Sequence, residues 1–362
     1  MRQKIAILGS TGSIGKNLLE IINKDRNKFE VVLLTANKNH SDLIKQAKKY
    51  NVKNLIIKNH KSYTLLKNIN LKGINIYNDY NNFNKFFKKK IDYVMSSISG
   101  MEGLGPTLNI IKFTKKIAIA NKESIICAWN LIQHELVKNK TKFVPVDSEH
   151  FSLWYALKNL PSSEIEKVYL TASGGPLLKF SKLKLKNVKL SQALKHPTWK
   201  MGKKISIDSC TMMNKVFEVI EAKHLFNLSY KKITVLTHPN SYIHAVVKFK
   251  NGLIKIIAHD TTMKIPIFNS IKSDKALSIK TNNLNLTKLN NLDLKKVNTK
   301  FFPVVNILKK LPNKISLYET VIVTINDLLV DQFLNKKITY KQLQDLLVKL
   351  TKKKLFAKYK KL

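Results

Sequence analysis

Cysteine is nearly absent from this chain of 362 residues. Only Cys127 and Cys210 occur; they lie far apart, and there is no CxxC pair. This argues against a disulfide scaffold and a zinc–cysteine site, and we expect a reducing, cytoplasmic setting. Long apolar runs are missing too, since none approaches the roughly 18 residues that span a bilayer. Met1 leads directly into an apolar strand pattern, so we expect no targeting peptide and no membrane partner.

Arginine and acidic residues are also scarce. The chain has 65 Lys and Arg against 23 Asp and Glu, a formal net charge of +42, yet Arg2 and Arg26 are its only arginines. Base readers and bidentate phosphate clamps depend on the planar guanidinium, which Lys does not reproduce. The lysines are spread along the chain with abundant Asn and Ile, so AT-rich codon bias explains them better than a nucleic-acid surface does. We therefore expect no nucleic-acid partner, although the field attracts anionic substrates.

The remaining composition is that of a globular protein, with 44% hydrophobic residues and a length that suggests two or three domains. Short apolar runs alternate with amphipathic stretches up to about residue 145, which predicts βαβ units and a mostly parallel sheet. The expected strands are 4–8, 31–35, 54–57, 93–96 and 117–120, and the expected helices are 16–23 and 41–50. Leucines at helical spacing close the chain, at positions 343, 346, 347 and 350.

These patterns predict an α/β protein. Its expected parts are an N-terminal Rossmann-like domain of βαβ units (1–145), an α+β domain that holds most of the polar clusters (146–271), a connecting arm (272–300) and a C-terminal helical domain (301–362).

A glycine-rich turn, Gly9-Ser-Thr-Gly12-Ser-Ile-Gly15, follows the first strand and opens a helix. Glycine lets the backbone approach a pyrophosphate, whose charge is held by the N–H groups and dipole of the helix N-terminus. An ordinary βα turn is the alternative. The second strand ends at residues 35–39 without the carboxylate that binds the ribose of NAD, and Lys38 favours the 2′-phosphate of NADP. We therefore expect NADPH.

Two carboxylates, Asp147 and Glu149, stand two residues apart in the segment VPVDSEH (144–150). In an extended segment they project to the same side and could converge on one hard cation. Paired carboxylates are costly to hold together without a cation or a shared proton. A helix N-cap at Asp147 or Ser148 and a surface turn are the alternatives.

The densest polar segment runs from His196 to Glu218. We expect a helix to begin near its capping-type residues, Asp208, Ser209 and Thr211. On that helix three side chains share a face by their spacing, Asn214, Lys215 and Glu218. They could hold a metal and a phosphorylated polyol together, although a surface salt bridge would have the same spacing.

Two loops accompany this segment. Residues 196–202 contain Pro197, Trp199 and Gly202, a composition suited to a mobile lid, and His196 is either functional or a structural imidazole. Residues 172–176 offer backbone N–H groups suited to a phosphate.

Taken together, these motifs resemble the 1-deoxy-D-xylulose 5-phosphate reductoisomerase family, NADPH- and divalent-metal-dependent enzymes of the non-mevalonate isoprenoid pathway. The matching segments are LGSTGSIG (8–15), ANKES (120–124), PVDSEH (145–150), TASGGP (171–176), HPTWKMGKKISIDSCTMMNK (196–215) and THPNSYIHAVV (237–247). They occur in the family's order over about the first two-thirds of the chain. The last third matches more weakly, through FFP (301–303) and a helical tail. The chain departs from the family pattern at Asn37, Cys210 and Val216.

The resemblance implies a role for each matching residue. NADPH would be contacted by Thr11, Gly12, Ser13, Ile14, Ala36, Asn37, Lys38, Asn39, Asn121, Glu123 and Gly202. Mg²⁺ or Mn²⁺ would be held by Asp147, Glu149 and Glu218. The substrate would be bound by Lys122, Ser148, Glu149, Ser173, His196, Ser209, Asn214, Lys215 and Glu218, among which Lys122, Glu149 and His196 are the candidate catalytic residues. Trp199 would lie on a closing flap.

The implied reaction rearranges 1-deoxy-D-xylulose 5-phosphate to an aldehyde, which NADPH reduces to 2-C-methyl-D-erythritol 4-phosphate, with the metal as Lewis acid. A homodimer is implied as well. One competing interpretation is another GxxGxxG dehydrogenase such as an aspartate-semialdehyde dehydrogenase, which needs a nucleophilic Cys with a His partner. The other is a Lys-rich nucleic-acid-binding protein, which would not explain the glycine turn or the acidic cluster.

Overall fold

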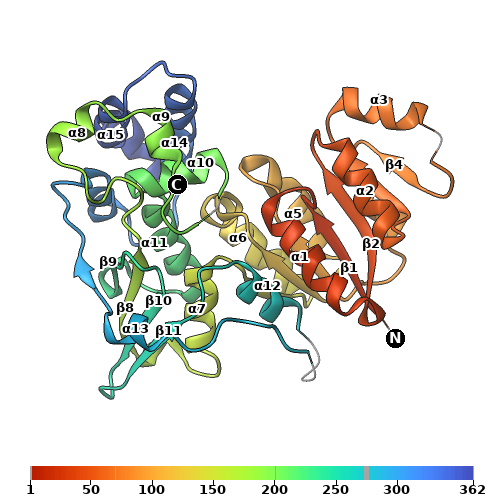
Figure 1. Ribbon diagram of the computed structural model, residues 1–362, viewed down its shortest axis with the longest axis horizontal. Helices are drawn as coiled ribbons and strands as arrows, with labels where there is room; N and C mark the ends of the chain where they lie inside the picture. Colours follow the sequence, from red (N-terminus) through yellow and green to blue (C-terminus); the bar gives the residue numbers. More distant parts are fainter. Residues whose placement is uncertain (1, 70, 200, 273–276, 362) are drawn as a thin grey trace. The chain divides into compact units, whose positions relative to one another are not determined.

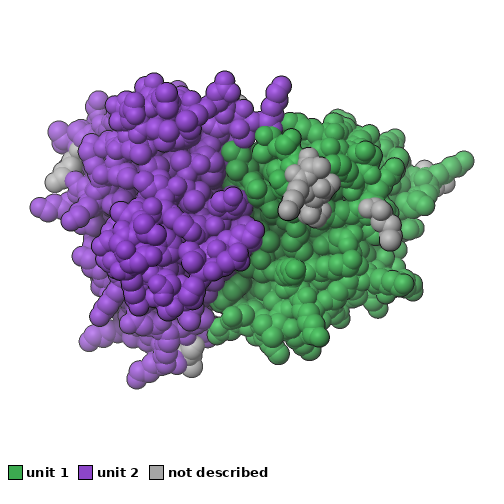
Figure 2. All heavy atoms as spheres, turned by 90° about the horizontal axis from the view of Figure 1, so that it is seen from below, with its two compact units in different colours: residues 1–147, 263–279 green, residues 148–262, 280–362 purple. Residues whose placement is uncertain are grey.

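The computed structural model describes residues 2–69, 71–199, 201–272 and 277–361 (Figure 1). The chain forms two compact units, Met1–Asp147 with Met263–Ile279, and Ser148–Thr262 with Lys280–Leu362 (Figure 2). A late segment therefore returns to the unit formed by the start of the chain. The expected functional division at 145, 271 and 300 stays a prediction.

The first unit is built on a parallel sheet. Within the described residues it has seven strands in the order β4-β3-β2-β1-β5-β6-β7. The strands are β1 (Gln3–Leu8), β2 (Phe29–Ala36), β3 (Asn54–Ile57), β4 (Asn75–Tyr77), β5 (Tyr93–Ser96), β6 (Lys116–Ile119) and β7 (Lys142–Pro145). The strand order reverses between β1 and β5, and the carboxyl end of a sheet at such a switch point is where dinucleotides bind.

Helices follow most of these strands, as the alternating pattern predicted. They are α1 (Ser13–Lys24), α2 (His40–Tyr50), α3 (His60–Asn68), α4 (Phe83–Phe86), α5 (Leu104–Ile111), α6 (Lys122–Lys138) and, from the late segment, α12 (Lys264–Ile271). The buried face of α1, including Leu18 and Ile22, belongs to the core under the sheet. α12 joins this unit through a buried hydrogen bond of 2.7 Å between Ser270 Oγ and Tyr93 Oη.

The second unit has a mixed sheet with α7 and α11 among the helices packed near it. Within the described residues its strand order is β11-β10-β8-β9-β12, where β8 and β9 are parallel and the other neighbours antiparallel. The strands are β8 (Ile165–Ala172), β9 (Ile233–Thr237), β10 (Ile243–Phe249), β11 (Ile254–Ala258) and β12 (Lys295–Lys296). The helices before β9 are α7 (Ser148–Ala156), α8 (Lys182–Lys186), α9 (Leu190–Leu194), α10 (Lys203–Thr211) and α11 (Met213–Phe226). α11 is buried along nearly its whole length, so its polar side chains need partners inside the protein.

The chain ends in helices, as the leucine spacing predicted. They are α13 (Leu286–Asn290), the 3₁₀ segment η5 (Pro303–Lys310), α14 (Tyr318–Leu334), α15 (Tyr340–Leu350) and η6 (Lys354–Lys360). Shorter 3₁₀ turns are Arg26–Lys28, Met101–Gly103, Ser162–Glu164 and Tyr230–Lys232. Two buried hydrogen bonds connect this part to α10, one of 2.7 Å from Asn326 to Asp208 and one of 2.9 Å from Tyr340 to the Cys210 carbonyl.

The expected α/β class, N-terminal dinucleotide fold and helical C-terminal end are confirmed. The predicted strands 54–57 and 93–96 coincide with β3 and β5, and the other three predicted strands differ from β1, β2 and β6 by one or two residues at their ends. The short strands β4 and β7 were not predicted. Across the part of the chain that the structure describes, no helix combines the length and apolar character needed to cross a bilayer.

Candidate active site

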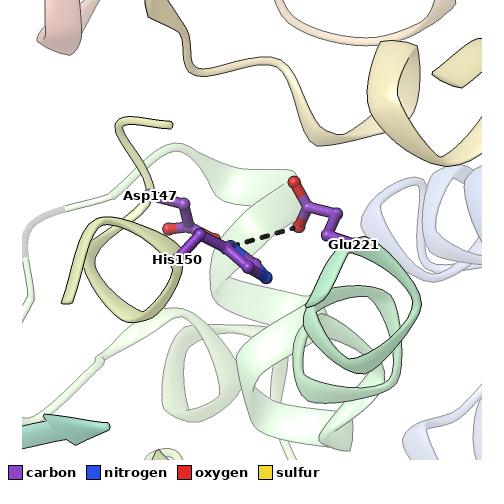
Figure 3. Close-up of side chains that lie close together, drawn as sticks. All are labelled: Asp147, His150 and Glu221. Atoms are coloured by element: carbon purple, nitrogen blue, oxygen red, sulfur yellow. Dashed lines mark ion pairs between the residues drawn. The ribbon is translucent and has the colours of Figure 1, made fainter. Parts of the chain in front are cut away.

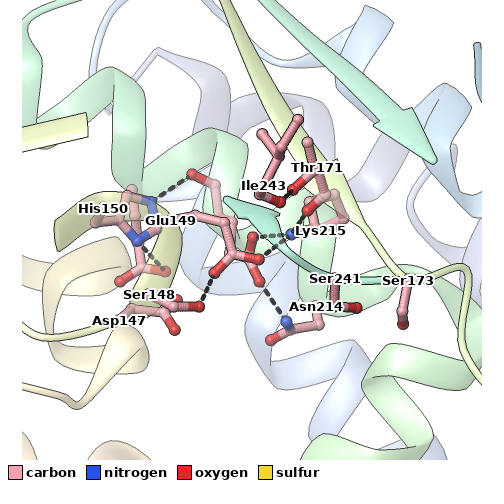
Figure 4. A network of polar contacts seen from close by, with 12 residues as sticks. Asp147, Ser148, Glu149, His150, Thr171, Ser173, Asn214, Lys215, Ser241 and Ile243 are labelled. Carbon is pink, nitrogen blue, oxygen red and sulfur yellow. Dashed lines mark hydrogen bonds and ion pairs between the residues drawn. The ribbon is translucent and has the colours of Figure 1, made fainter. Parts of the chain in front are cut away.

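Three carboxylates come together where β7 leads into α7. Oxygen atoms of Asp147, Glu149 and Glu218 all lie within 4.8 Å of one another. Asp147 is the last residue of the first unit and is joined directly to Ser148, the first residue of α7 (Figure 4). Glu149 is the second residue of α7, so the carboxylates converge at a strand-to-helix turn and not along the extended segment that we expected. Oxygen ligands at this spacing suit a hard divalent cation.

Two ammonium groups balance this acidic cluster. Lys122 Nζ lies 2.9 Å from Asp147 Oδ2, and Lys215 Nζ lies 2.6 Å from Glu149 Oε1. Lys215 also donates to Glu218 Oε2 and to the carbonyl of Thr171 (Figure 4). Burial lowers the pKa of Lys215, but Glu149 and Glu218 outweigh it, and the net shift of this pKa is upward. The group is therefore a fixed cation that keeps both carboxylates ionised and in place.

A break between α10 and α11 precedes Asn214, whose side chain contacts the acidic cluster. A helix does begin near Asp208, Ser209 and Thr211, as predicted, because α11 starts at Met213, but these three residues lie inside α10. Met212 takes the left-handed conformation with φ of 67°, and the helix that carries Asn214 starts at Met213. The Thr211 hydroxyl donates back to carbonyls of α10, and its Oγ1 also accepts the backbone N–H of Met213, the first residue of α11, at 3.3 Å. Asn214, Lys215 and Glu218 still share a face of one helix, as predicted, and Asn214 Nδ2 donates to Glu218 Oε1.

The glycine loop after β8 approaches α10 closely. Gly174 and Gly175 have φ of +82° and +69°, which favours glycine. A Cβ on Gly175 would lie 2.8 Å from the carbonyl oxygen of Ser209. Because Gly175 has no side chain, the backbone near Ser173 can lie against α10, the helix that carries Ser209.

His196 connects this loop to the segment expected to be a lid. Its Nε2 lies 3.0 Å from Ser173 Oγ, and its Nδ1 accepts the backbone N–H of Trp199 at 3.0 Å. Since Nδ1 is an acceptor, the proton of the neutral ring is on Nε2 and is donated to Ser173. Burial lowers the pKa of His196 to about 4. The described residues of 196–202 form neither helix nor strand, Lys200 lies outside the described residues, and the mobility of this segment stays a prediction.

The glycine turn after β1 is shaped by backbone contacts. Gly9 has φ of +83°, and a Cβ on Gly15 would lie 2.5 Å from the Cα of Ser10. Gly12 precedes the first turn of α1, in which Ser13 and Ile14 expose N–H groups without an acidic neighbour. Thr11 lies in the same turn. This turn has the close approach that a pyrophosphate site needs.

The other residues expected to contact NADPH differ in whether their side chains already make hydrogen bonds within the protein. Ala36 ends β2, and Asn37 and Lys38 follow it with exposed side chains, whereas the side chain of Asn39 caps α2 by accepting the Asp42 N–H at 3.1 Å. Asn121 caps α6 and donates to the carbonyl of Gly100 at 2.8 Å, so its side chain is committed to the fold. Glu123 is buried in the first turn of α6. Gly202 precedes α10 and belongs to the second unit.

A histidine and a carboxylate behind the acidic cluster were not assigned a role from the sequence. His150 Nε2 lies 2.8 Å from the carbonyl oxygen of Glu218, and its Nδ1 lies 3.9 Å from Glu221 Oε2 (Figure 3). Both side chains are buried, and together with Asp147 they form a second group within 4.8 Å. The i,i+3 spacing of Glu218 and Glu221 could have placed both carboxylates on one face of the helix. It could not have indicated His150, which contacts Glu221 from another helix.

Cys210 does not fit the chemistry of the competing dehydrogenase. Its side chain is fully buried, and burial raises the pKa of its thiol. A thiol that stays protonated and inaccessible is a poor nucleophile.

Comparison with known proteins gives one family over most of the chain. The model described as 1-deoxy-D-xylulose 5-phosphate reductoisomerase matches residues 5–129. Its C-terminal domain matches residues 143–226, and a further model, the DXP reductoisomerase C-terminal domain, matches residues 260–362.

Relatives and solved structures agree with these models. The 1-deoxy-D-xylulose 5-phosphate reductoisomerase of Pelagibacter ubique is 54% identical over 99% of this chain and 93% of the relative, and that of Clostridium perfringens is 38% identical over 95% and 91%. The Zymomonas mobilis enzyme, solved with NADPH, has a TM-score of 0.85 at 31% identity, covering 97% of this chain and 92% of the other. A DOX-P reductoisomerase solved with NADPH, fosmidomycin and magnesium has a TM-score of 0.88 at 30% identity, covering 98% and 90%. The chain belongs to the 1-deoxy-D-xylulose 5-phosphate reductoisomerase family.

Proposed function

We propose that this chain rearranges 1-deoxy-D-xylulose 5-phosphate and reduces it with NADPH to 2-C-methyl-D-erythritol 4-phosphate, in the presence of Mg²⁺ or Mn²⁺. The observation that carries the proposal is the contact of Glu149 with the buried residues Lys215 and Glu218, joined by Asp147, in a member of this family. The reaction is a step of the non-mevalonate isoprenoid pathway.

The metal is held by Asp147, Glu149 and Glu218, whose oxygen donors and mutual distances suit a hard cation. When bound, it supplies Lewis acidity toward the carbonyl and hydroxyl oxygens of the substrate. Lys215 keeps Glu149 and Glu218 ionised and oriented before any ligand arrives. The amide of Asn214, which donates to Glu218, fixes the same carboxylate from its other side.

The substrate lies among Lys122, Ser148, Ser173, His196, Ser209, Asn214 and Lys215. Its phosphate is bound near Ser173, Ser209, Asn214 and Lys215, where the glycine loop and α10 approach each other. Asn214 Oδ1 has no hydrogen-bond partner among the described residues and is available to a substrate hydroxyl. Lys122 and Glu149 are the two groups that can hold or move a proton at the substrate oxygens, and neutral His196 donates a hydrogen bond.

NADPH binds to the first unit at the glycine turn, with its pyrophosphate at the N-terminus of α1 and its 2′-phosphate near Lys38. Thr11, Gly12, Ser13 and Ile14 present backbone at this turn, and Ala36, Asn37 and Asn39 lie around Lys38 at the end of β2. Asn121 and Glu123 at the start of α6, and Gly202 of the second unit, complete the proposed contacts. Because its amide is committed to the fold, Asn121 contacts the cofactor through its backbone.

The chain acts in the cytoplasm as a homodimer. The scarcity of cysteine, with no CxxC pair, supports a reducing compartment, and the family resemblance supports the dimer. Residues 1–145 form the NADPH-binding domain, and residues 146–271 form the catalytic domain. Residues 272–300 connect it to the C-terminal helical domain, residues 301–362.

The experiment follows NADPH oxidation by the whole chain with 1-deoxy-D-xylulose 5-phosphate, with and without Mg²⁺. We expect oxidation that requires both the sugar phosphate and the metal. Equal rates without the metal, or no oxidation with it, would refute the proposal.

A further inference from the structure

Four aromatic rings form a continuous column inside the second unit. The ring of Trp199 lies 6.2 Å from that of His244 in an edge arrangement at 70°. His244 stacks on His259 with centroids 3.7 Å apart and planes at 14°. His259 meets Phe151 edge-on at 6.5 Å and 63°. Contacts of this geometry are favourable beyond the area that they bury.

The column joins two parts of the proposed site that are distant in sequence. Trp199 belongs to the segment expected to close over the substrate, whereas Phe151 stands on α7, two residues after Glu149. His244 is the second residue of β10, and His259 directly follows β11, the antiparallel neighbour of β10. The sheet thus holds the two imidazoles face to face between the lid segment and the helix of the acidic cluster.

Hydrogen bonds and burial fix the two imidazoles. His244 Nε2 lies 3.2 Å from the carbonyl oxygen of His259, and His259 Nδ1 lies 2.8 Å from that of Asp260. Burial lowers the pKa of His244 to about 3 and also lowers the pKa of His259. Near neutral pH both rings are therefore uncharged and stack without repulsion. The backbone acceptor for His244 is independent of the side chain at 259, so that side chain contributes only its ring to the stack.

We propose that His259 is a positioning residue of the substrate site: its ring fixes the orientation of His244, and through it the surface on which Trp199 rests. The proposal rests on the proposed function for its kinetic consequence, because ordering the lid segment is part of binding the substrate. Without the ring, His244 can turn into the space left behind, and Trp199 loses its support. Substrate binding then has to order more of the segment, which raises KM and leaves kcat little changed.

The first arm of the test needs no substrate. Tryptic cleavage after Lys203 is followed in the whole chain by mass spectrometry, relative to cleavage after Lys353 in the same digest. We expect His259→Ala to accelerate cleavage after Lys203 about fivefold, in the range of one aromatic contact, and His259→Phe to behave as wild type. His224→Leu, a change at a buried histidine outside the column, serves as the control and should leave the ratio unchanged. Equal ratios in wild type and His259→Ala would overturn the proposal.

The second arm is a double-mutant cycle in the NADPH-oxidation assay. We expect His259→Ala to raise KM for 1-deoxy-D-xylulose 5-phosphate about fivefold with kcat within about twofold, and His259→Phe to restore KM. In a Trp199→Leu background, His259→Ala should have no further effect, because the ring acts through Trp199. The same rise in KM in both backgrounds would overturn the proposal, since the ring would then act on the site by another route. A wild-type chain without turnover would refute the proposed function, while the cleavage arm would still decide the role of His259.

Discussion

The acidic cluster and the glycine turn are built in opposite ways. At the acidic cluster the chemistry lies in charged side chains, and Lys122 and Lys215 hold the carboxylates of Asp147, Glu149 and Glu218 in place. At the glycine turn the chemistry lies in the backbone, and the decisive feature is a missing side chain. The first site is therefore sensitive to charge and the second to volume, and a substitution at one should leave the ligand of the other bound.

The largest effect is expected when a charge is removed from the acidic cluster. Glu218→Gln keeps the size of the side chain but removes a metal ligand, so kcat should fall about a thousandfold, several kcal/mol of transition-state stabilisation. NADPH affinity, measured by fluorescence titration, should stay within about twofold because the glycine turn is untouched. Glu166→Gln is the matched control, since Glu166 pairs with Lys248 at the surface. Equal activity of Glu218→Gln and Glu166→Gln would remove Glu218 from the metal site.

The complementary change adds volume to the glycine turn. In Gly15→Ala the new Cβ would lie 2.5 Å from Ser10 Cα and 2.7 Å from Gly9 O, so the turn must open. We expect NADPH affinity to fall about a hundredfold, while the affinity for Mn²⁺ by titration calorimetry stays unchanged. Gly105→Ala is the control, because a Cβ there meets nothing within 4 Å. A Gly15→Ala chain that binds NADPH normally would show that the tight turn is not part of the cofactor site.

A smaller effect is expected at the edge of the cofactor site, where a side chain does carry charge. Lys38→Asp places a carboxylate beside the 2′-position of the ribose, where it repels a phosphate and accepts a hydroxyl. The ratio of kcat/KM for NADPH over NADH should fall about tenfold or more. This change corresponds to the free energy of one charge-assisted hydrogen bond. Lys48→Asp on the exposed side of α2 makes the same charge change and should leave the ratio near its wild-type value. If both variants change the ratio equally, the general positive field and not Lys38 selects the cofactor.

The last change tests stability and not ligand binding, at a buried group on α11 that, unlike Glu218, has no ionic partner of opposite sign among the described residues. Both ring nitrogens of His224 lack hydrogen-bond partners there, and burial, followed by Lys223, lowers its pKa from 6.5 to about 3. The unfolded chain therefore takes up this proton first, so stability that is present above pH 6.5 is lost as the pH falls toward 3.

His224→Leu should remove this dependence. Urea denaturation should show that the variant gains about 2 kcal/mol over wild type between pH 8 and pH 5, as the shift in pKa requires. A parallel loss of stability in both proteins would mean that His224 is protonated in the folded state.

Local features of the site could be predicted from the sequence, and contacts between distant elements could not. The glycine turn consists of consecutive residues, and Asp147 and Glu149 are near neighbours, so their spacing was informative. The face shared by Asn214, Lys215 and Glu218 follows from helical geometry. The break at Met212 was invisible, because a left-handed methionine is imposed by packing and not by local preference.

The partners of these residues depend on how separate elements pack. The contacts of Lys215 with Glu149 and Thr171, and of His150 with Glu221, join helices and strands far apart in the chain. The stack of His244 on His259 requires the pairing of β10 with β11, which neither histidine signals alone. The family resemblance supplied roles for single residues, and helical spacing indicated a pairing of Lys215 with Glu218. The sequence did not reveal that Lys122 pairs with Asp147 or Lys215 with Glu149.

The most direct test follows the hydride and the carbon skeleton together. The chain is incubated with 1-deoxy-D-xylulose 5-phosphate, Mg²⁺ and NADPH deuterated at its transferable position, and the product is identified by NMR. We predict 2-C-methyl-D-erythritol 4-phosphate carrying one deuterium on the carbon of the former aldehyde. Glu218→Gln should form this product about a thousandfold more slowly, and no product should form without a divalent metal. A reduced product with the original carbon skeleton, or the same product formed without metal, would contradict the assignment of this reaction to the acidic cluster.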